Sequence, residues 1–147
     1  MKYLAFIVPF LVISCSSHEH QDEPSFSRRY IQPTNGYSQM VVVEQNGIKT
    51  LHISGQVGEG DDLDTQMRDV LKKLGDLLES EGGTYADLVK INTYIVDYKP
   101  EDLDIFRGVR KEIFTDAVTP ASTLVGVTSL ALPEWLIEID AVAVIEE

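Results

Sequence analysis

Residues 119–144 read TPASTLVGVTSLALPEWLIEIDAVAV, and this stretch decides the fold. Two runs rich in β-branched residues are joined by a turn at Pro133, a pattern that predicts two strands. Side chains alternate along a strand, so Ile137 and Ile139 share one face of the second run while Glu138 and Asp140 share the other. Two neighbouring carboxylates in a half-buried face repel each other. We therefore expect at least one raised pKa, which general acid–base chemistry requires.

Five further elements are predicted upstream and complete an α+β fold. Strands at 38–43 and 50–56 flank Asn46-Gly47, a hairpin turn signal. A helix is predicted over 61–81, a strand over 89–96 and a second helix from Pro100 to about residue 114. With closing strands at 122–127 and 136–145 the order is ββαβαββ, which suits a mixed sheet with both helices on one face.

Several predicted strands are apolar on both faces, as in Met40 and Val42 against Val41 and Val43. Two helices cover only one face of such a sheet, and an uncovered apolar face is a surface for association. The pattern predicts a homo-oligomer. The alternative is a monomer whose sheet is partly wet.

The N-terminus predicts export. Residues 1–14 combine Lys2 with a ten-residue apolar run, which is too short for a stable membrane span and is typical of a signal peptide. Val12-Ile13-Ser14-Cys15 resembles a lipobox, so Cys15 is the expected lipidation site and the only membrane contact. The alternative is a plain secretory signal with an accidental cysteine. We expect an exported lipoprotein that is membrane-anchored and faces the periplasm or the cell exterior.

Residues 15–29 are expected to form the lipidated cysteine and a flexible tether, and residues 30–147 to form one domain. His18 and His20 lie in that tether, where two ligands make a poor metal site, so no metal is predicted. No cofactor-binding motif is visible in the sequence. The net charge of −12 argues against nucleic-acid binding, which depends on Lys and Arg neutralising phosphates.

Three segments together resemble the RidA (YjgF) family of enamine/imine deaminases: SGQV at 54–57, GGTYADLVKINTYIVD at 82–97, and residues 119–144. The resemblance implies a chorismate-mutase-like fold and a homotrimer with a small-molecule pocket at each subunit boundary. It implies hydrolysis of a reactive C=N intermediate to a carbonyl and ammonia, without a cofactor.

Four positions acquire roles from this resemblance. Glu138 matches the glutamate that orients or activates the attacking water, and Gly55 matches a glycine whose backbone approaches the ligand. Tyr37 resembles a tyrosine lining the pocket, with an ordinary core or surface tyrosine as the alternative. Active members carry an arginine after the Pro-Ala step, where its fork binds the substrate carboxylate; this chain has Ser122 there.

The serine leaves three possibilities open: a neutral substrate, another cation, or a pocket that binds a small metabolite without catalysis. Arg107 is the predicted substitute cation, although an arginine beside an apolar helix stripe commonly covers that stripe and keeps its head in water. Arg110 is expected to face solvent. Asp140 either takes part in the chemistry or only pairs with a lysine or arginine across a subunit interface. The preferred function is a deaminase with altered substrate preference, and the alternative is an inactive trimeric metabolite-binding protein.

Overall fold

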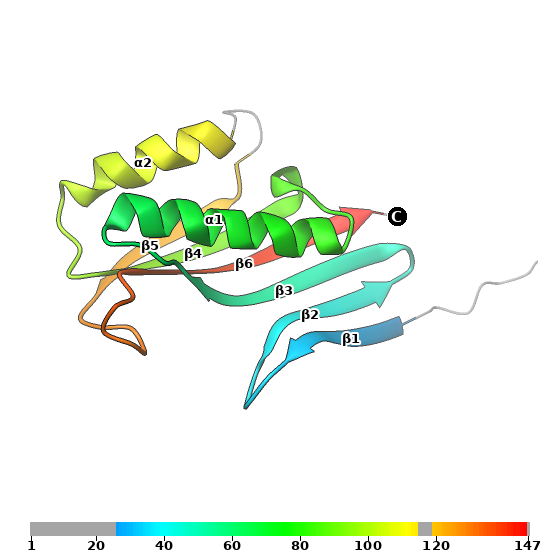
Figure 1. Cartoon of the computed structure of the whole chain (residues 1–147). Coiled ribbons are helices and arrows are strands. Elements are labelled where there is room, and N and C mark those ends of the chain that lie inside the picture. The colour runs from blue at the N-terminus through cyan, green and yellow to red at the C-terminus, as the bar shows by residue number, and fades with distance from the viewer. Residues whose placement is uncertain (1–25, 115–118, 147) are drawn as a thin grey trace, which may run out of the picture.

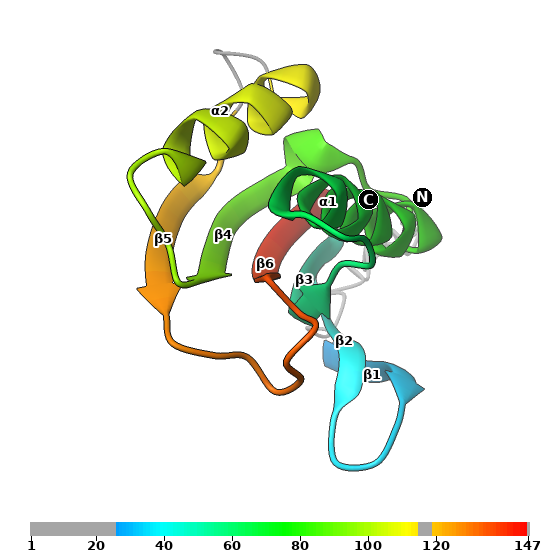
Figure 2. The same cartoon turned by 60° about the vertical axis from the view of Figure 1, so that its left-hand side comes forward.

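A computed structural model of the chain describes residues 26–114 and 119–146. The sheet has six strands in the order β1-β2-β3-β6-β4-β5, and both helices lie on one of its faces (Figures 1 and 2). Only the β4–β5 pair is parallel among the described strands. The predicted mixed sheet with two helices on one face is confirmed.

The elements follow the predicted order with one addition at the start. Their bounds are β1 Phe26–Pro33, β2 Ser38–Gln45, β3 Ile48–Val57, α1 Leu63–Ser80, a 3-10 turn η1 Tyr85–Asp87, β4 Leu88–Val96, α2 Asp102–Ile113, β5 Ala121–Val127 and β6 Ile137–Glu146. Most predicted boundaries lie within two residues of these. Helix α1 starts later than predicted because Asp62 serves as its N-cap and accepts a hydrogen bond from the Thr65 backbone N–H at 2.8 Å.

Strand β1 corrects the predicted tether, because residues 26–29 belong to the sheet and not to a flexible segment. β1 pairs antiparallel with β2 at the edge of the sheet. Arg29 holds the strand by ion pairs to Glu44 on β2 and to Glu81 at the end of α1. The sequence did not predict β1, because a polar strand at the edge of a sheet has no apolar pattern. With β1 added, the order of the elements is βββαβαββ. The predicted signal peptide, Cys15, His18 and His20 lie outside the described residues.

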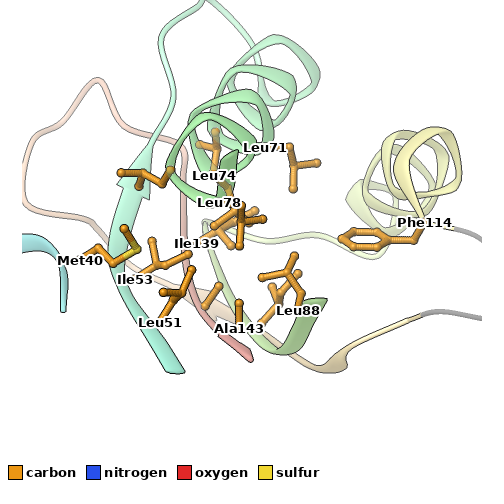
Figure 3. Close-up of a cluster of buried hydrophobic side chains, with 14 of the residues drawn as sticks. Met40, Leu51, Ile53, Leu71, Leu74, Leu78, Leu88, Phe114, Ile139 and Ala143 are labelled. Atoms are coloured by element: carbon orange, nitrogen blue, oxygen red, sulfur yellow. The ribbon is translucent and has the colours of Figure 1, made fainter. Parts of the chain in front are cut away.

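The core lies between the helices and the sheet (Figure 3). Helix α1 packs against β3 and β6 and contributes Leu71, Leu74 and Leu78 to this core. From the sheet come Leu51 and Ile53 on β3 together with alternate residues of β6. The hairpin prediction is confirmed, since Asn46 and Gly47 both have positive φ, at 53° and 78°.

Neither of the two helices in the described part of the chain covers the opposite face of the sheet (Figures 1 and 2). Half-buried valines lie there in the middle of the sheet, at Val41, Val43, Val142 and Val144. Tyr30 extends the same face on the edge strand and is 57% exposed. We call this the open face of the sheet.

Among the described residues, no helix is long and apolar enough to cross a membrane.

Candidate functional site

Strand β6 places two carboxylates on the open face. Ile137 and Ile139 point into the core and are 0% and 1% exposed. Glu138 and Asp140, which alternate with them along the strand, are half-buried. Across the ladder, Glu138 lies opposite Tyr94 and Asp140 lies opposite Asn92, both on β4. The alternation predicted from the sequence therefore gathers four polar side chains at the centre of the sheet. We call Asn92, Tyr94, Glu138 and Asp140 the carboxylate cluster.

Glu138 rests on the backbone of Gly55. The pairing of β3 with β6 shifts register between Ile53 and Gln56, and Gly55 lies in that irregularity. A Cβ atom at residue 55 would overlap the Glu138 carboxylate, with Oε1 as the nearest atom. The glycine is thus required because the carboxylate occupies the space that any other side chain would take.

Asp140 is held by two neighbours on β4. Asn92 donates from Nδ2 to Oδ1 of Asp140 at 2.8 Å. The Tyr94 hydroxyl also hydrogen-bonds Asp140, and the charge of Asp140 is the main cause that raises the pKa of Tyr94. Within the described part of one chain, the side chains that neighbour Asp140 on β4 are thus polar and uncharged, and the alternative of an ion pair across an interface would need a second copy.

The pKa of Glu138 is raised, first by burial and second by the charge of Asp140. Both causes were expected from two carboxylates in a half-buried strand face. A carboxyl with a raised pKa takes up and releases a proton closer to neutral pH, which suits a general acid or base. The arrangement can therefore move a proton at the Glu138 oxygens.

A groove of ≈ 420 Å³ opens at the same end of the sheet. It lies between α1 and the β1–β2 hairpin, and its lining includes Tyr37, Gly55 and Trp135. Gln56 donates from Nε2 to Gln39 Oε1 at 3.0 Å along the wall. Of the predicted site residues, Tyr37 and Gly55 therefore line this groove together. Glu138 is not among its lining residues and is linked to it only through its close approach to Gly55.

Ser122 and Arg107 lie away from Glu138 in the folded chain. Ser122 is exposed near the start of β5 and pairs with Ile91, which is buried, so it faces the helix side of the sheet. Arg107 is exposed on α2. Within one chain neither residue shares a face with Glu138, so any common pocket needs a second copy.

The arginine that reaches Ser122 is Arg110. Its Nη1 donates to the Ser122 Oγ at 3.1 Å, and its guanidinium carbon lies over the rings of Phe106 and Phe114. Arg110 is half-buried, which corrects the expectation that it faces solvent, and burial lowers its pKa. The Phe-Arg-Phe spacing of four residues, visible at 106, 110 and 114, was the signal that sequence reasoning missed.

Comparison with known proteins gives one family and many related structures. The family model described as Endoribonuclease L-PSP matches residues 27–145. A YjgF-family protein of Neisseria meningitidis is 30% identical, with 82% of this chain and 97% of that chain covered and a TM-score of 0.70. A Rid-family protein of Yersinia pestis is 37% identical, with 79% and 97% covered and a TM-score of 0.62. A YjgF-type protein of Mycobacterium tuberculosis is 29% identical, with 81% and 100% covered and a TM-score of 0.68.

Proposed function

This chain belongs to the Endoribonuclease L-PSP family, which includes the YjgF and Rid proteins, and on that basis we propose that it hydrolyses a small, reactive enamine or imine. The supporting observation is the Glu138 carboxyl, which sits on the Gly55 backbone beside Asp140 and has a raised pKa. A nuclease role, as the family description suggests, fits poorly with a net charge of −12, because phosphate binding depends on clustered Lys and Arg.

The proposed reaction asks for one proton-transfer group and little else. Water adds to the carbon of the C=N bond, and Glu138 takes a proton from that water and passes it to the nitrogen, which gives a carbinolamine. Glu138 then takes the proton of the carbinolamine hydroxyl and passes it to the same nitrogen, so that the C–N bond breaks, ammonia leaves and a carbonyl product remains. One water is consumed and one ammonia released for each C=N bond. Proton transfer by a positioned side chain contributes about 10²–10⁴-fold to such rates.

The rest of the carboxylate cluster has a positioning role in this proposal. Burial first and the charge of Asp140 second keep the pKa of Glu138 raised, and the hydrogen bond from Asn92 holds Asp140 in place. Ligand would approach from the groove at Tyr37, because Gly55 borders both the groove and Glu138.

YjgF-family proteins are typically homotrimers, and we propose the same assembly here, with open faces against one another. The half-buried valines of that face support it, because apolar area left in water favours association. In such an assembly each pocket lies at a subunit boundary. A second copy then supplies the α2–β5 side, with Ser122, to the Glu138 side of the first.

We further propose that the protein is an exported lipoprotein, anchored through lipid on Cys15 and facing the periplasm or the cell exterior. The support is the sequence pattern at 1–15 alone. Labelling cells with a radioactive fatty acid tests it: the wild-type chain incorporates label and Cys15→Ala does not. Label in the alanine variant contradicts the proposal.

The activity is tested with the full-length protein in a mild detergent, using imines generated in the cuvette with and without a carboxylate group. Release of ammonia is expected to exceed the uncatalysed rate. Glu138→Gln should lower that rate by about 10²-fold or more. Gly55→Ala should also lower it, because its Cβ displaces the same carboxylate. Glu146→Gln is the matched control, as the same change at an exposed position of the same strand.

Equal rates for wild type and Glu138→Gln contradict the proposed role of Glu138. The second candidate function, metabolite binding without catalysis, is favoured by Ser122, because a hydroxyl cannot form the two charged hydrogen bonds of a guanidinium. A wild type that binds carbonyl acids but hydrolyses no imine supports it, especially if Ser122→Arg gains activity.

A further inference from the structure

The groove between α1 and the β1–β2 hairpin is lined by side-chain amides and aromatic rings. Its volume of ≈ 420 Å³ falls in the range of about 300–1,000 Å³ that is typical of small-molecule sites. Gln39 and Gln56 belong to its wall, and so do Tyr37 and Trp135. Gln56 is only 8% exposed, so a hydrogen bond to its amide affects the free energy more than one at an open surface. The groove therefore favours a ligand with polar groups.

The hydrogen bonds within the groove leave both a donor and an acceptor side open to a ligand. Gln56 donates from Nε2 to Gln39 Oε1 at 3.0 Å and to the Ser54 carbonyl oxygen at 2.9 Å. In the described part of the chain, its own Oε1 accepts no hydrogen bond. Gln39 donates to the Tyr37 hydroxyl oxygen at 3.5 Å, which leaves the phenolic proton free. The Trp135 indole N–H also has no acceptor among the described residues.

The two charged side chains that line the groove have opposite signs, and each already has a partner. Lys73 Nζ lies 2.9 Å from the Asp69 carboxylate and donates to the Val57 carbonyl oxygen at 3.0 Å. Asp76 pairs with Lys72 at 2.7 Å. Among its described lining residues the groove thus offers no unpaired cation to an acid and no unpaired anion to an amine. The net charge of −12 repels anions further, so a neutral ligand is favoured.

We propose that this groove binds a neutral, hydroxyl-rich ligand, namely a mono- or disaccharide. Each sugar hydroxyl carries one donor and two acceptor lone pairs, which match the open oxygen of Gln56 and the free donors of Tyr37 and Trp135. The C–H face of a sugar ring can also pack on Tyr37 or Trp135, because each presents an apolar body with a polar tip. An apolar ligand would leave the Gln56 oxygen without a partner, which costs free energy.

The site goes beyond the proposed function, because a sugar can occupy the groove without any turnover. All of the residues that form it come from one chain, so binding does not depend on the assembly of three copies. On the further premise of the proposed hydrolysis, the imine carries a hydroxyl-rich tail, because Gly55 borders both the groove and Glu138.

Fluorescence titration of the full-length protein in a detergent without a sugar head group tests the site, because Trp135 is the only tryptophan of the chain and lines the groove. The probes are glucose, galactose, mannose, N-acetylglucosamine, maltose and lactose, each raised to tens of millimolar. At least one of them is expected to change the emission until it saturates. Its uronic acid and its amino-sugar form should bind about tenfold more weakly or worse, because their charge finds no free partner in the groove.

Variants of the groove are compared by calorimetry with the sugar that binds. Tyr37→Ala should weaken binding by about tenfold or more, because it removes both a ring and a donor. Gln39→Leu keeps the size of the side chain without the amide and should weaken binding by about fivefold, as loss of one neutral hydrogen bond predicts. Tyr30→Ala is the matched control, since Tyr30 lies outside the groove and is 57% exposed against 55% for Tyr37, and it should bind as wild type does.

Circular dichroism melting separates lost binding from lost folding, and the exposed Tyr37 still gives a result if Gln39→Leu does not fold. The proposal is overturned if none of the sugars binds, or if folded Tyr37→Ala binds as tightly as wild type. Tighter binding of a charged sugar, or of zwitterionic alanine, than of every neutral sugar also overturns it. Sugar binding without ammonia release contradicts only the proposed hydrolysis, and ammonia release without sugar binding contradicts only this site.

Discussion

The two faces of the sheet carry different tasks, and β6 shows the division most clearly. Ile137, Ile139 and Ala143 face the helices and are at most 1% exposed. The residues between them on the open face are half-buried, and two are carboxylates. Strand alternation lets a single ten-residue segment contribute both to the core and to the carboxylate cluster. Substitutions on one face should therefore change folding, and those on the other should change association and chemistry.

The largest expected effect on stability comes from the helix-covered face. Ile139→Ala removes a fully enclosed side chain and should lower the free energy of unfolding by about 2–5 kcal/mol, through lost burial and a cavity. Val142→Ala on the open face is the matched change in the same strand. Urea unfolding at several protein concentrations measures both. The valine variant should lose stability in a concentration-dependent way if, as we propose, Val142 makes its contacts between copies.

If both variants lost the same free energy of unfolding at every protein concentration, the two faces of the sheet would not have different roles. In that case Val142 would serve the core of a single chain as Ile139 does.

A smaller effect concerns the pH dependence of stability. The folded-state pKa of Glu138 is raised, so between the ordinary value of 4.5 and that raised value the folded chain binds more protons than the unfolded chain. Rising pH through this window therefore removes stability from the wild type but not from Glu138→Gln. The stability of the variant relative to wild type should increase with pH there, by at most about 1.4 kcal/mol per pH unit for one group.

Denaturant unfolding of both proteins from pH 4 to pH 8 measures this difference. Glu146→Gln, at an exposed position of β6, serves as the control and should show no such trend. A Glu138→Gln variant that loses stability relative to wild type as pH rises would mean that the site holds the carboxylate in its charged form.

Much of the fold could be predicted from the sequence because its signals are local. The alternation of β6 and the turn at Asn46-Gly47 each depend on neighbouring residues, and so does the apolar stripe of α1. Strand β1 could not be predicted, because pairing at an edge is supplied by β2 and leaves no periodicity in β1 itself. The added strand widens the sheet, and therefore also the open face, by one strand.

The site was predictable where one strand carries it and less so where distant segments meet. Glu138 follows from alternation, yet its seat on Gly55 depends on the irregular pairing of β3 with β6. Arg110 has a visible Phe-Arg-Phe spacing, but its partner Ser122 is brought close only by the parallel pairing of β5 with β4. Arg107, which was preferred from the sequence, lies exposed one helical turn away.

Native mass spectrometry of the full-length chain released from detergent tests most directly whether the open face is where copies meet. Wild type should give the mass of three chains. Val142→Asp, which puts a charge in the middle of that face, should give the mass of one chain while its circular dichroism spectrum stays that of wild type. A wild-type protein that has the mass of a single chain would contradict the assembly, and with it the shared pocket around Glu138.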